Sequence, residues 1–494
     1  MKLELIAATT FGLEAPVKRE IEALGYKILR SEDGKITFLG DERAIVRANL
    51  WLRCADRVQI KMGEFEALEF EDLFQQMKGI PWEQWIPPEG RFIVNGSSVK
   101  SKLSSVPACQ SVAEKALIER LKETYAIDYF EKSGALYDIK VSILKDRVTV
   151  TLDTTGPSLH KRGYRQSAVA APIKETLAAA MIQLSFWKPD RILVDPCCGS
   201  GTIPIEAAMI GRNIAPGLSR HFAAEEWEAI PADLWREERQ QAYEAVDWDK
   251  PLEIYGYDID SNAVRAAEEN AAEAGVTDDI VFERHDGAAI DSGGQEGGII
   301  ITNPPYGERI SSSDLFGLYE SIGNRLKHVF KGYDAWIISY HKECFDKIGL
   351  KPSVKIDLMN GALECEYRKY EIFDGRYKEF KEEGKNLDKR EGQTRRTNLR
   401  GKAPFDRKRT YDSDRRSDKT ERFDRSGKPS FRRDSKPGKP IGKKTFDRPE
   451  RFKPDGEKSE RLHGEAAFRK FVTFKQPSIK PSDDNRKKDS DKPE

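Results

Sequence analysis

The strongest constraint on the fold is the stretch RILVDPCCGSGTIPIEAAMI, residues 191–210. Its apolar run Ile192–Val194 predicts a short buried strand, and the glycines that follow predict a tight turn into a helix. Pro204 suits the first turn of that helix, because the N–H that proline lacks would be unpaired there anyway. A strand, a glycine turn and a helix in this order are typical of the nucleotide-binding crevice of a parallel α/β sheet.

The turn does not match a dinucleotide site, which needs a third glycine and a carboxylate about 20 residues downstream. Here Pro204 takes the third glycine position, and the next strand-end carboxylates, Asp258 and Asp260, follow a long insertion. Carboxylates suit the ribose hydroxyls and the cationic methionine end of S-adenosylmethionine. We expect Asp195 to face the methionine end, Asp258 the ribose and Asp286 the adenine amino group, whereas Asp260 is expected to cap the next helix. The other predicted cofactor contacts lie in the turn: Pro196, Gly199, Gly201 and Thr202.

A second motif, NPPY at residues 303–306, follows the apolar strand GGIIIT. An exocyclic amine on a ring is a poor nucleophile because its lone pair is delocalised, and two acceptors aimed at its hydrogens can localise that pair. We expect the side-chain carbonyl of Asn303 and the main-chain carbonyl of Pro304 to be those acceptors, with Tyr306 stacking on a flat base. Alone, NPPY could be an ordinary β-turn. After a strand and downstream of DPCCGSGT, it predicts methylation of an amino group.

Longer strings accompany the two motifs: SLHKRGYR at 158–165, APIKETLAAAMI at 171–182 and NIAPGL at 213–218. Together they resemble class I methyltransferases with an N-terminal THUMP domain, closest to the RlmL-like guanine-N2 methyltransferases of 23S ribosomal RNA. The resemblance covers roughly residues 1–375 and implies an RNA substrate and S-adenosylmethionine as cofactor. Bifunctional members carry a second methyltransferase domain where this chain has a charged tail, so no second methylation is expected. The two motifs alone would also fit enzymes that act on tRNA, adenine-N6, cytosine-N4 or a protein glutamine.

The fold class that follows is α/β. A doubly wound, Rossmann-like class I methyltransferase domain is preceded by an α+β N-terminal module and a THUMP domain, and is followed by a disordered C-terminal tail. The alternating strands and helices of the C-terminal half predict the parallel sheet, and the mixed segments before them predict small α+β units. We expect these parts at residues 1–43 (N-terminal module), 44–155 (THUMP domain), 156–375 (methyltransferase domain) and 376–494 (tail).

Charge divides the chain at residue 376. Of the 83 Lys and Arg and the 83 Asp and Glu, 38 and 23 respectively lie from residue 376 onward, so the tail carries +15 and residues 1–375 carry 45 − 60 = −15. The tail has only six residues of the set Ile, Leu, Val and Met, too few to bury a core. Its basic residues and spaced aromatics fit salt-sensitive RNA contact. Its interleaved acids fit a solubilising tail equally well.

An acidic body must bind RNA through local clusters of basic residues. The stretch HKRGYR supplies the predicted RNA contacts Lys161, Arg162 and Arg165, because it joins the N-terminal half to the catalytic half. Lys100 and Lys102 are a second candidate. A third lies in AIVRANLWLRCADRV, where arginines more commonly form a solvated helix face. If methylation were incidental, the same features would describe an RNA-binding ribosome-assembly factor.

The remaining features concern metals and location. The six cysteines show neither CxxC nor Cys/His ligand spacing, so we expect reduced, mostly buried thiols and no metal. No apolar run reaches membrane-spanning length, and Glu4 and Glu14 interrupt the N-terminal stretch. The sequence therefore predicts a cytoplasmic protein.

Overall fold

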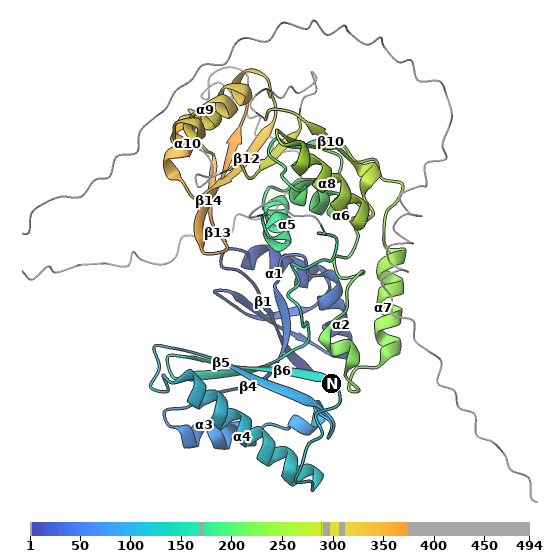
Figure 1. Cartoon of the computed structure of the whole chain (residues 1–494), viewed down its shortest axis with the longest axis vertical. Coiled ribbons are helices and arrows are strands. Elements are labelled where there is room, and N and C mark those ends of the chain that lie inside the picture. Colours follow the sequence, from blue (N-terminus) through green and yellow to red (C-terminus); the bar gives the residue numbers. More distant parts are fainter. Residues whose placement is uncertain (1, 167–171, 288, 290–296, 306–311, 374–494) are drawn as a thin grey trace, which may run out of the picture. The chain divides into compact units, whose positions relative to one another are not determined.

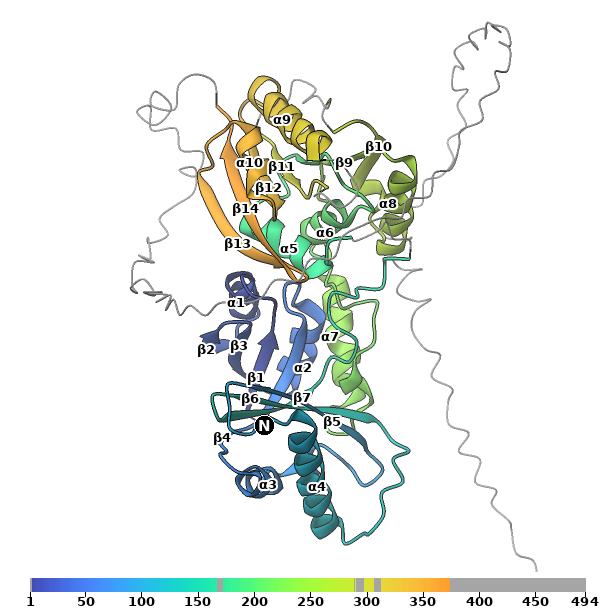
Figure 2. The same cartoon turned by 60° about the vertical axis from the view of Figure 1, so that its left-hand side comes forward.

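The computed structural model describes residues 2–166, 172–287, 289, 297–305 and 312–373, which form two seven-stranded sheets and their covering helices (Figures 1 and 2). The tail from residue 376, expected to be disordered, and Tyr306 lie outside these residues. The described residues all belong to one compact unit.

The first sheet has the strand order β2-β3-β1-β4-β7-β6-β5. Its long strand β4 pairs with β1 through its first half and with β7 through most of its length, so a single strand joins two α+β modules. Buried residues alternate along β6, as expected for a sheet with one face covered. The strands are β1 (Leu3–Ala8), β2 (Lys27–Glu32), β3 (Lys35–Gly40), β4 (Arg57–Glu66), β5 (Arg91–Val99), β6 (Leu136–Leu144) and β7 (Arg147–Asp153).

Helices cover one face of this sheet in two groups. Helices α1 and α2 pack on β1–β4, and α3 and α4 pack together beside β5 and β6 (Figure 2). The expected boundary between residues 43 and 44 falls inside α2. The helices are α1 (Glu14–Ala23), α2 (Glu42–Trp51), α3 (Phe70–Lys78), the 3₁₀ turn η1 (Trp82–Gln84) and α4 (Val106–Tyr125).

The second sheet has the order β10-β9-β8-β11-β12-β14-β13, in which β10 to β12 are parallel and β14 and β13 are antiparallel. The chain leaves β8 towards β9 and β10, then returns to place β11 on the other side of β8. This reversal is the switch point at which such sheets bind ligands. The strands are β8 (Leu193–Asp195), β9 (Ile254–Asp258), β10 (Ile280–Arg284), β11 (Ile299–Thr302), β12 (Asp334–Ser339), β13 (Val354–Asn360) and β14 (Leu363–Glu371).

Both faces of the second sheet are covered, which confirms the predicted doubly wound arrangement. Leu193 packs in one hydrophobic cluster and Val194 in a second, as neighbouring strand residues that point to opposite faces must. Helices α5, α6 and α8 contribute to the first cluster, and α9 and α10 to the second. These helices are α5 (Glu175–Leu184), α6 (Thr202–Gly211), α8 (Ser261–Ala274), the 3₁₀ turn η3 (Thr277–Asp279), α9 (Ser312–His328) and α10 (Lys342–Ile348).

The long insertion between α6 and β9 contains η2 (Ala223–Glu226) and α7 (Ala232–Glu244). Helix α7 packs against α2 of the first sheet, where the buried carboxylate of Glu238 pairs with Arg43 and Arg47. Trp227 stacks on Tyr137 of β6, with ring centroids 4.9 Å apart. The insertion therefore ties the second sheet to both modules of the first.

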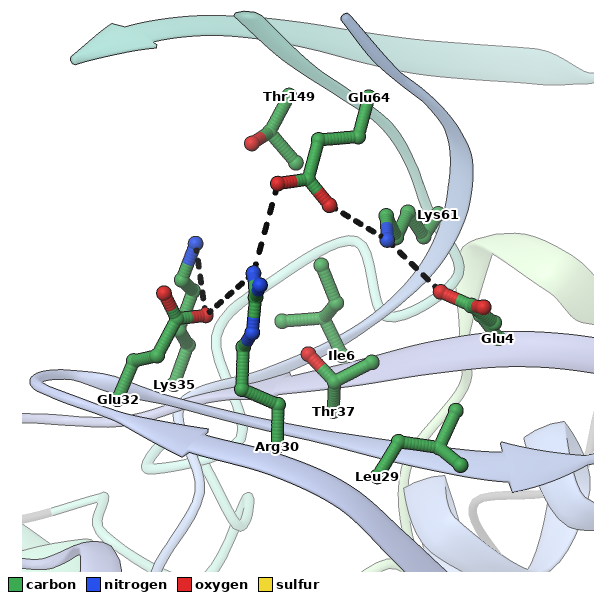
Figure 3. Close-up of a pocket in the computed structure, with 10 residues that line it drawn as sticks. All are labelled: Glu4, Ile6, Leu29, Arg30, Glu32, Lys35, Thr37, Lys61, Glu64 and Thr149. Atoms are coloured by element: carbon green, nitrogen blue, oxygen red, sulfur yellow. Dashed lines mark hydrogen bonds and ion pairs between the residues drawn. The ribbon is translucent and has the colours of Figure 1, made fainter. Parts of the chain in front are cut away.

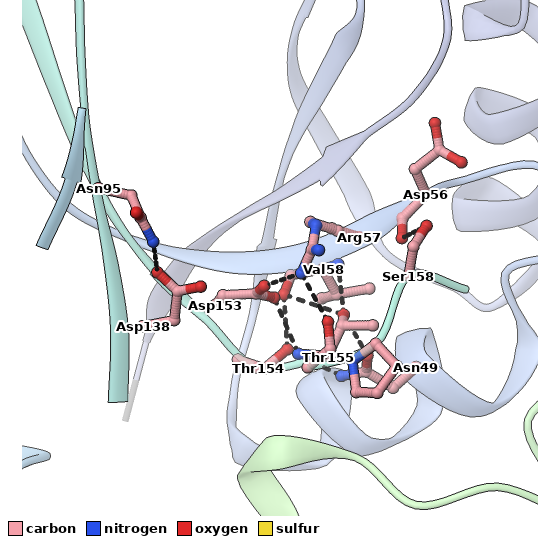
Figure 4. A network of polar contacts seen from close by, with 12 residues as sticks. Asn49, Asp56, Arg57, Val58, Asn95, Asp138, Asp153, Thr154, Thr155 and Ser158 are labelled. Atoms are coloured by element: carbon pink, nitrogen blue, oxygen red, sulfur yellow. Dashed lines mark hydrogen bonds and ion pairs between the residues drawn. The ribbon is translucent and has the colours of Figure 1, made fainter. Parts of the chain in front are cut away.

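A buried polar network fixes the chain where it leaves β7 (Figure 4). The amide nitrogen of Asn49 on α2 donates to the Thr154 hydroxyl over 2.8 Å, and the Thr155 hydroxyl donates to the Asn49 carbonyl over 2.7 Å. The Thr155 hydroxyl also accepts from the backbone N–H of Val58 on β4. One amide side chain therefore joins α2, β4 and the start of the linker to the second sheet.

We expect Asn49→Ala to lower the free energy of unfolding by about 1–3 kcal/mol, because it removes two buried hydrogen bonds, those to the hydroxyls of Thr154 and Thr155. The matched control is Asn95→Ala on β5, whose amide donates to Asp138 over 2.7 Å at an exposed position and should cost about 0.5 kcal/mol or less. Urea unfolding of the two variants measures both values. Equal losses would contradict a structural role for the Asn49 network.

Candidate active site

The candidate site lies at the carboxyl ends of β8, β9 and β11, which are neighbours in the second sheet. Asp195 ends β8, Asp258 ends β9, and Asn303 follows the last residue of β11. Carboxyl ends of parallel strands meet at one edge of a sheet. The structure therefore brings the two motifs, about a hundred residues apart in the chain, to one place.

The glycine turn between β8 and α6 is held in a conformation that favours glycine. Gly199 has φ +55° and Gly201 has φ +81°, and a Cβ on Gly201 would lie 2.9 Å from that of Ala267. Gly201 is the N-cap of α6, whose first turn contains no acidic residue. N–H groups in the first turn of a helix have no acceptor within the helix, so this turn can donate to an anionic or polar ligand.

Asp195 is buried beneath this turn, with 1% of its surface exposed. Its Oδ1 accepts hydrogen bonds from the Thr302 hydroxyl (2.7 Å) and from the backbone N–H of Cys197 (3.1 Å). Burial raises the pKa of Asp195 to about 7, although both hydrogen bonds act in the opposite direction. The carboxyl group is thus poised to change its protonation state near neutral pH when a cation approaches.

Asp258 and Asp260 have different surroundings. Asp258 Oδ2 accepts from the backbone N–H of Gly199 (2.9 Å), so this carboxylate lies directly against the glycine turn. Asp260 Oδ1 accepts from the N–H of Asn262 (2.9 Å) and caps α8, as its sequence position predicted. Asp286 is exposed, and its neighbour Gly287 lies so close to the turn that a Cβ would be 2.4 Å from Pro196 O.

The side chain of Asn303 has a buried acceptor with no partner. Its Oδ1 is shielded from solvent and accepts no hydrogen bond among the described residues. An unpaired buried acceptor costs about 1–3 kcal/mol, so such an atom is a candidate for contact with a ligand. Pro304 is also buried, whereas the predicted stacking residue Tyr306 lies outside the described part of the chain.

The linker residues expected to bind RNA have different surroundings in the structure. Arg162 is 3% exposed and bonds Glu206 of α6, the carbonyl of Leu159 and the carbonyl of Arg53. Its guanidinium therefore stabilises the fold. A side chain buried in this way does not fit the RNA contact expected of Arg162. Lys161 is exposed and remains accessible.

Arg165 lies against the start of α6, next to the glycine turn. Its Nη2 donates to the Thr202 hydroxyl at the start of α6 (2.9 Å) and to the carbonyl of Ile173 (2.8 Å). The same nitrogen lies 3.4 Å from Glu175. Arg165 is therefore placed to brace the start of α6, which its position in the sequence did not reveal.

Sequence reasoning also missed two polar residues of the site. Thr302 donates to Asp195 and thereby joins the ends of β8 and β11. Asn270 of α8 is fully buried, donates to the carbonyl of Ser200 in the turn (3.1 Å) and accepts from the N–H of Gln166 in the linker (3.1 Å). The position of Thr302 directly before NPPY was a usable signal, whereas Asn270, one of two asparagines in an alanine-rich helix, offered none.

A surface pocket elsewhere takes no part in this site. It lies over strands β1–β4 and β7 of the first sheet, and its charged side chains are paired with one another (Figure 3). Lys61 pairs with Glu4 and Glu64, and Arg30 pairs with Glu32. Its charges are therefore largely compensated, and no residue of the second sheet lines it.

Comparison with known domain families divides the chain into three matches. Residues 4–59 match the RlmL ferredoxin-like domain, residues 67–153 match the THUMP domain, and residues 162–369 match the RMKL-like methyltransferase domain. The residues that form the candidate site lie within the third match.

The chain is 44% identical over 374 residues to the putative RNA methyltransferase YpsC of Bacillus subtilis, covering 75% of this chain and 96% of that protein. It is 35% identical over 392 residues to ribosomal RNA large subunit methyltransferase K/L of Syntrophotalea carbinolica. That match covers 76% of this chain, which spans only 54% of that relative's length.

Solved structures give the same fold. A crystal structure titled as a predicted N6-adenine-specific DNA methylase from Listeria monocytogenes is 43% identical, with a TM-score of 0.72 over 75% of this chain and 97% of that one. SMU.472, a putative methyltransferase complexed with SAH, is 39% identical, with a TM-score of 0.72 over 76% and 99%. Within the described residues, no helix is long and apolar enough to cross a membrane.

The raised pKa of Asp195 predicts how stability depends on pH. The folded protein holds this proton more tightly than the unfolded chain, so raising the pH from the unfolded value near 4 towards about 7 should destabilise the wild type by about 1.4 kcal/mol per pH unit. Asp195→Asn keeps the acceptor and does not titrate. The free energy of unfolding of Asp195→Asn, compared with that of the wild type, should therefore rise between pH 5 and pH 7 and then stay constant.

Urea unfolding at pH 5, 6, 7 and 8 checks this difference. Thr302→Val is a second variant, because loss of the hydroxyl donor should raise the pKa of Asp195 further and extend the destabilisation to higher pH. If the difference in free energy of unfolding between the wild type and Asp195→Asn were the same at every pH, the raised pKa of Asp195 would be refuted.

Proposed function

The chain belongs to the family of THUMP-containing, RlmL-like RNA methyltransferases, and from that premise we propose that it methylates the N2 amine of a guanine in RNA. The methyl donor in this proposal is S-adenosylmethionine, and the favoured substrate is 23S ribosomal RNA in the cytoplasm. The observation that carries the proposal is the buried, unpartnered Oδ1 of Asn303 at the end of β11.

Asn303 supplies what an aromatic amine needs. Its carbonyl oxygen, together with the main-chain carbonyl of Pro304, would accept the two amine hydrogens and localise the nitrogen lone pair. The desolvation cost of the unpaired acceptor is already present in the free protein, so it would be relieved when the amine arrives. Tyr306 would offer a face for the flipped base. No strong base is required before transfer, because the ammonium product can release its proton afterwards.

The same geometry supports the proposed cofactor residues. When bound, S-adenosylmethionine supplies an electrophilic methyl group on a sulfonium centre. Asp195 would face its methionine end, Asp258 its ribose and Asp286 its adenine amino group, while Gly199 and Gly201 leave room for close approach to the backbone. The buried Ser200 hydroxyl, which has no partner among the described residues, supports a polar ligand at this turn. The protein's contribution is alignment and electrostatic complementarity.

The choice of base and RNA rests on the relatives. The relative named ribosomal RNA large subunit methyltransferase K/L supports a 23S target, and the THUMP match supports RNA over DNA. A guanine in tRNA is the alternative substrate for the same site. A role purely in ribosome assembly would leave the buried Asn303 acceptor without a purpose.

We expect Asn303→Ala to reduce turnover by about a hundredfold or more, because it removes a polar group used at the transition state. Cofactor affinity, measured by calorimetry with S-adenosylhomocysteine, should stay within about twofold. Asn262→Ala, an exposed residue on α8, is the control and should retain activity. If Asn303→Ala lost cofactor affinity as strongly as it lost turnover, the assigned role of Asn303 would be rejected.

Asp258→Ala should weaken binding of S-adenosylhomocysteine by tenfold or more, because the ribose loses its acceptor and the Gly199 N–H loses its partner. Asp260→Asn is the matched control, since asparagine still caps a helix. Calorimetry on both variants measures the difference. Unchanged affinity in Asp258→Ala would remove this residue from the cofactor site.

The direct test of the reaction is nucleoside mass spectrometry on 23S ribosomal RNA and tRNA from cells that lack the protein. Loss of N2-methylguanosine from one 23S site, restored by the wild type and not by Asn303→Ala, is the expected result. Loss from tRNA alone would move the substrate to tRNA. Persistence of every methylated nucleoside in both RNAs would overturn the proposed function.

A further inference from the structure

Two aromatic rings lie just beyond the carboxyl end of β12. Tyr340 and His341 follow Ser339, the last residue of this strand, and precede α10. Their ring centroids are 3.9 Å apart, and the ring planes meet at 35°. Neither ring is fully buried, and the side chain of His341 is 35% exposed. We call these two residues the aromatic pair.

The strand order places the aromatic pair beside Asn303. Strand β12 lies next to β11, on the side away from β8. Because β11 and β12 are parallel, their carboxyl ends meet at the same edge of the sheet. The proposed cofactor residues at the ends of β8 and β9 therefore lie on one side of Asn303, and the aromatic pair lies on the other.

The register sets how far the aromatic pair extends beyond Asn303. Thr302, the last residue of β11, lies opposite Ile337, and Asn303 follows directly. Strand β12 continues for two more residues, which is about 6–7 Å at about 3.3 Å per residue, and Tyr340 comes next. Adjacent strands are about 4.8 Å apart. These offsets are on the scale of one nucleobase, so the pair can touch a base whose amine reaches Asn303.

Tyr340 lies on the face of the second sheet that α6 covers. Trp336 and Ile338 of β12 belong to the first hydrophobic cluster, and the partly buried ring of Tyr340 packs against the same cluster, as alternation along a strand requires. Ile203 and Ile205 of α6 belong to this cluster too. Helix α6 begins at the glycine turn, so the Tyr340 ring and the proposed cofactor turn share one face of the sheet.

Hydrogen bonds fix the turn that carries the aromatic pair. The N–H of His341 donates to the hydroxyl of Ser339 (3.2 Å), and Ser339 is buried. The carbonyl of His341 accepts from the N–H of Cys344 in α10 (3.2 Å), and Cys344 is also buried. A side chain on an anchored turn loses less conformational freedom when a ligand arrives, so the pair is preorganised for binding.

The exposure of the aromatic pair distinguishes it from the rings that fill the core beside it. Trp336 on β12 and Tyr367 on β14 stack with centroids 4.8 Å apart, and both are buried. The aromatic pair follows on the same strand and yet keeps accessible surface. A flat base has two faces, and Tyr306 is assigned only one of them in the proposed function. Aromatic side chains suit the other face, because every base has a π-face on which a ring can stack.

We propose that the aromatic pair forms the second wall of the base pocket and stacks on the face of the target base that Tyr306 does not cover. The inference rests on the proposed function and names the residues that position the base in it. A base whose amine bonds Asn303 points that amine towards the cofactor, so its ring extends over β11 and β12, where the pair lies. The contact aligns the base and transfers no proton, so cofactor binding does not depend on it.

The test replaces both rings in the full chain, either by leucine (Tyr340→Leu with His341→Leu) or by phenylalanine (Tyr340→Phe with His341→Phe). Leucine keeps an apolar side chain without a π-face, whereas phenylalanine keeps the ring without the polar atoms. The matched control is Phe186→Leu, at an aromatic residue that is 68% exposed in the loop before β8. Transfer of tritiated methyl groups from S-adenosylmethionine to total RNA from cells that lack the protein gives kcat and KM. Calorimetry with S-adenosylhomocysteine measures cofactor affinity.

We expect the leucine variant to lose about tenfold or more in kcat/KM for RNA, because stacking of one base on aromatic side chains contributes on that scale. The phenylalanine variant and Phe186→Leu should stay within about threefold of the wild type, because the first keeps the rings and the second lies away from the site. Cofactor affinity should stay within about twofold in all three variants, because the aromatic pair contacts the base and not the cofactor.

Four results overturn the inference. Wild-type kcat/KM in the leucine variant would reject the second wall alone and leave the proposed methylation standing. Equal losses in the leucine and phenylalanine variants would reject stacking, because the polar atoms and not the rings would then matter. If the leucine variant lost cofactor affinity as strongly as kcat/KM, the pair would have a structural role instead. Absence of methyl transfer to RNA by the wild type would reject the second wall and the proposed function together.

Discussion

The hydrogen bond from Thr302 to Asp195 joins the two halves of the site. It links the ends of β8 and β11, the adjacent strands at which the sheet reverses its winding, so the two motifs share one position. Because Asp195 is buried, this bond and the one from the Cys197 N–H are what offset its desolvation. The placement of Asn303, one residue beyond Thr302, therefore depends on a contact beneath the glycine turn.

A second buried contact links helix α6, which follows this turn, to the first sheet. Arg162 bonds both Glu206 of α6 and the carbonyl of Arg53, which lies just beyond α2. Burying a charged pair is costly unless each member is well bonded, and removing one partner leaves an uncompensated charge. The position of Arg162 is thus better explained by this structural requirement than by RNA contact. The start of α6 is fixed by residues from outside the methyltransferase sheet.

Local sequence patterns were sufficient to predict the strands, the glycine turn and the doubly wound sheet, because apolar runs and turn residues act within a few positions. The capping role of Asp260 was equally local. The burial of Arg162 could not be predicted in this way, since its partners Glu206 and Arg53 are 44 and 109 residues away. The packing of α7 on α2 likewise depends on a pairing between Glu238 and Arg43 that no short pattern contains.

The same long-range pairings explain why counting basic residues is a poor guide to an RNA surface in this chain. Arg43 pairs with Glu237 and Glu238, Arg47 pairs with Glu238, and Arg57 pairs with Asp153. Cations that are paired with carboxylates in this way attract phosphate weakly, however many of them the sequence contains. A cation contributes to RNA binding only when it is exposed and locally uncompensated, so exposure and pairing in the folded protein decide which cations can do so.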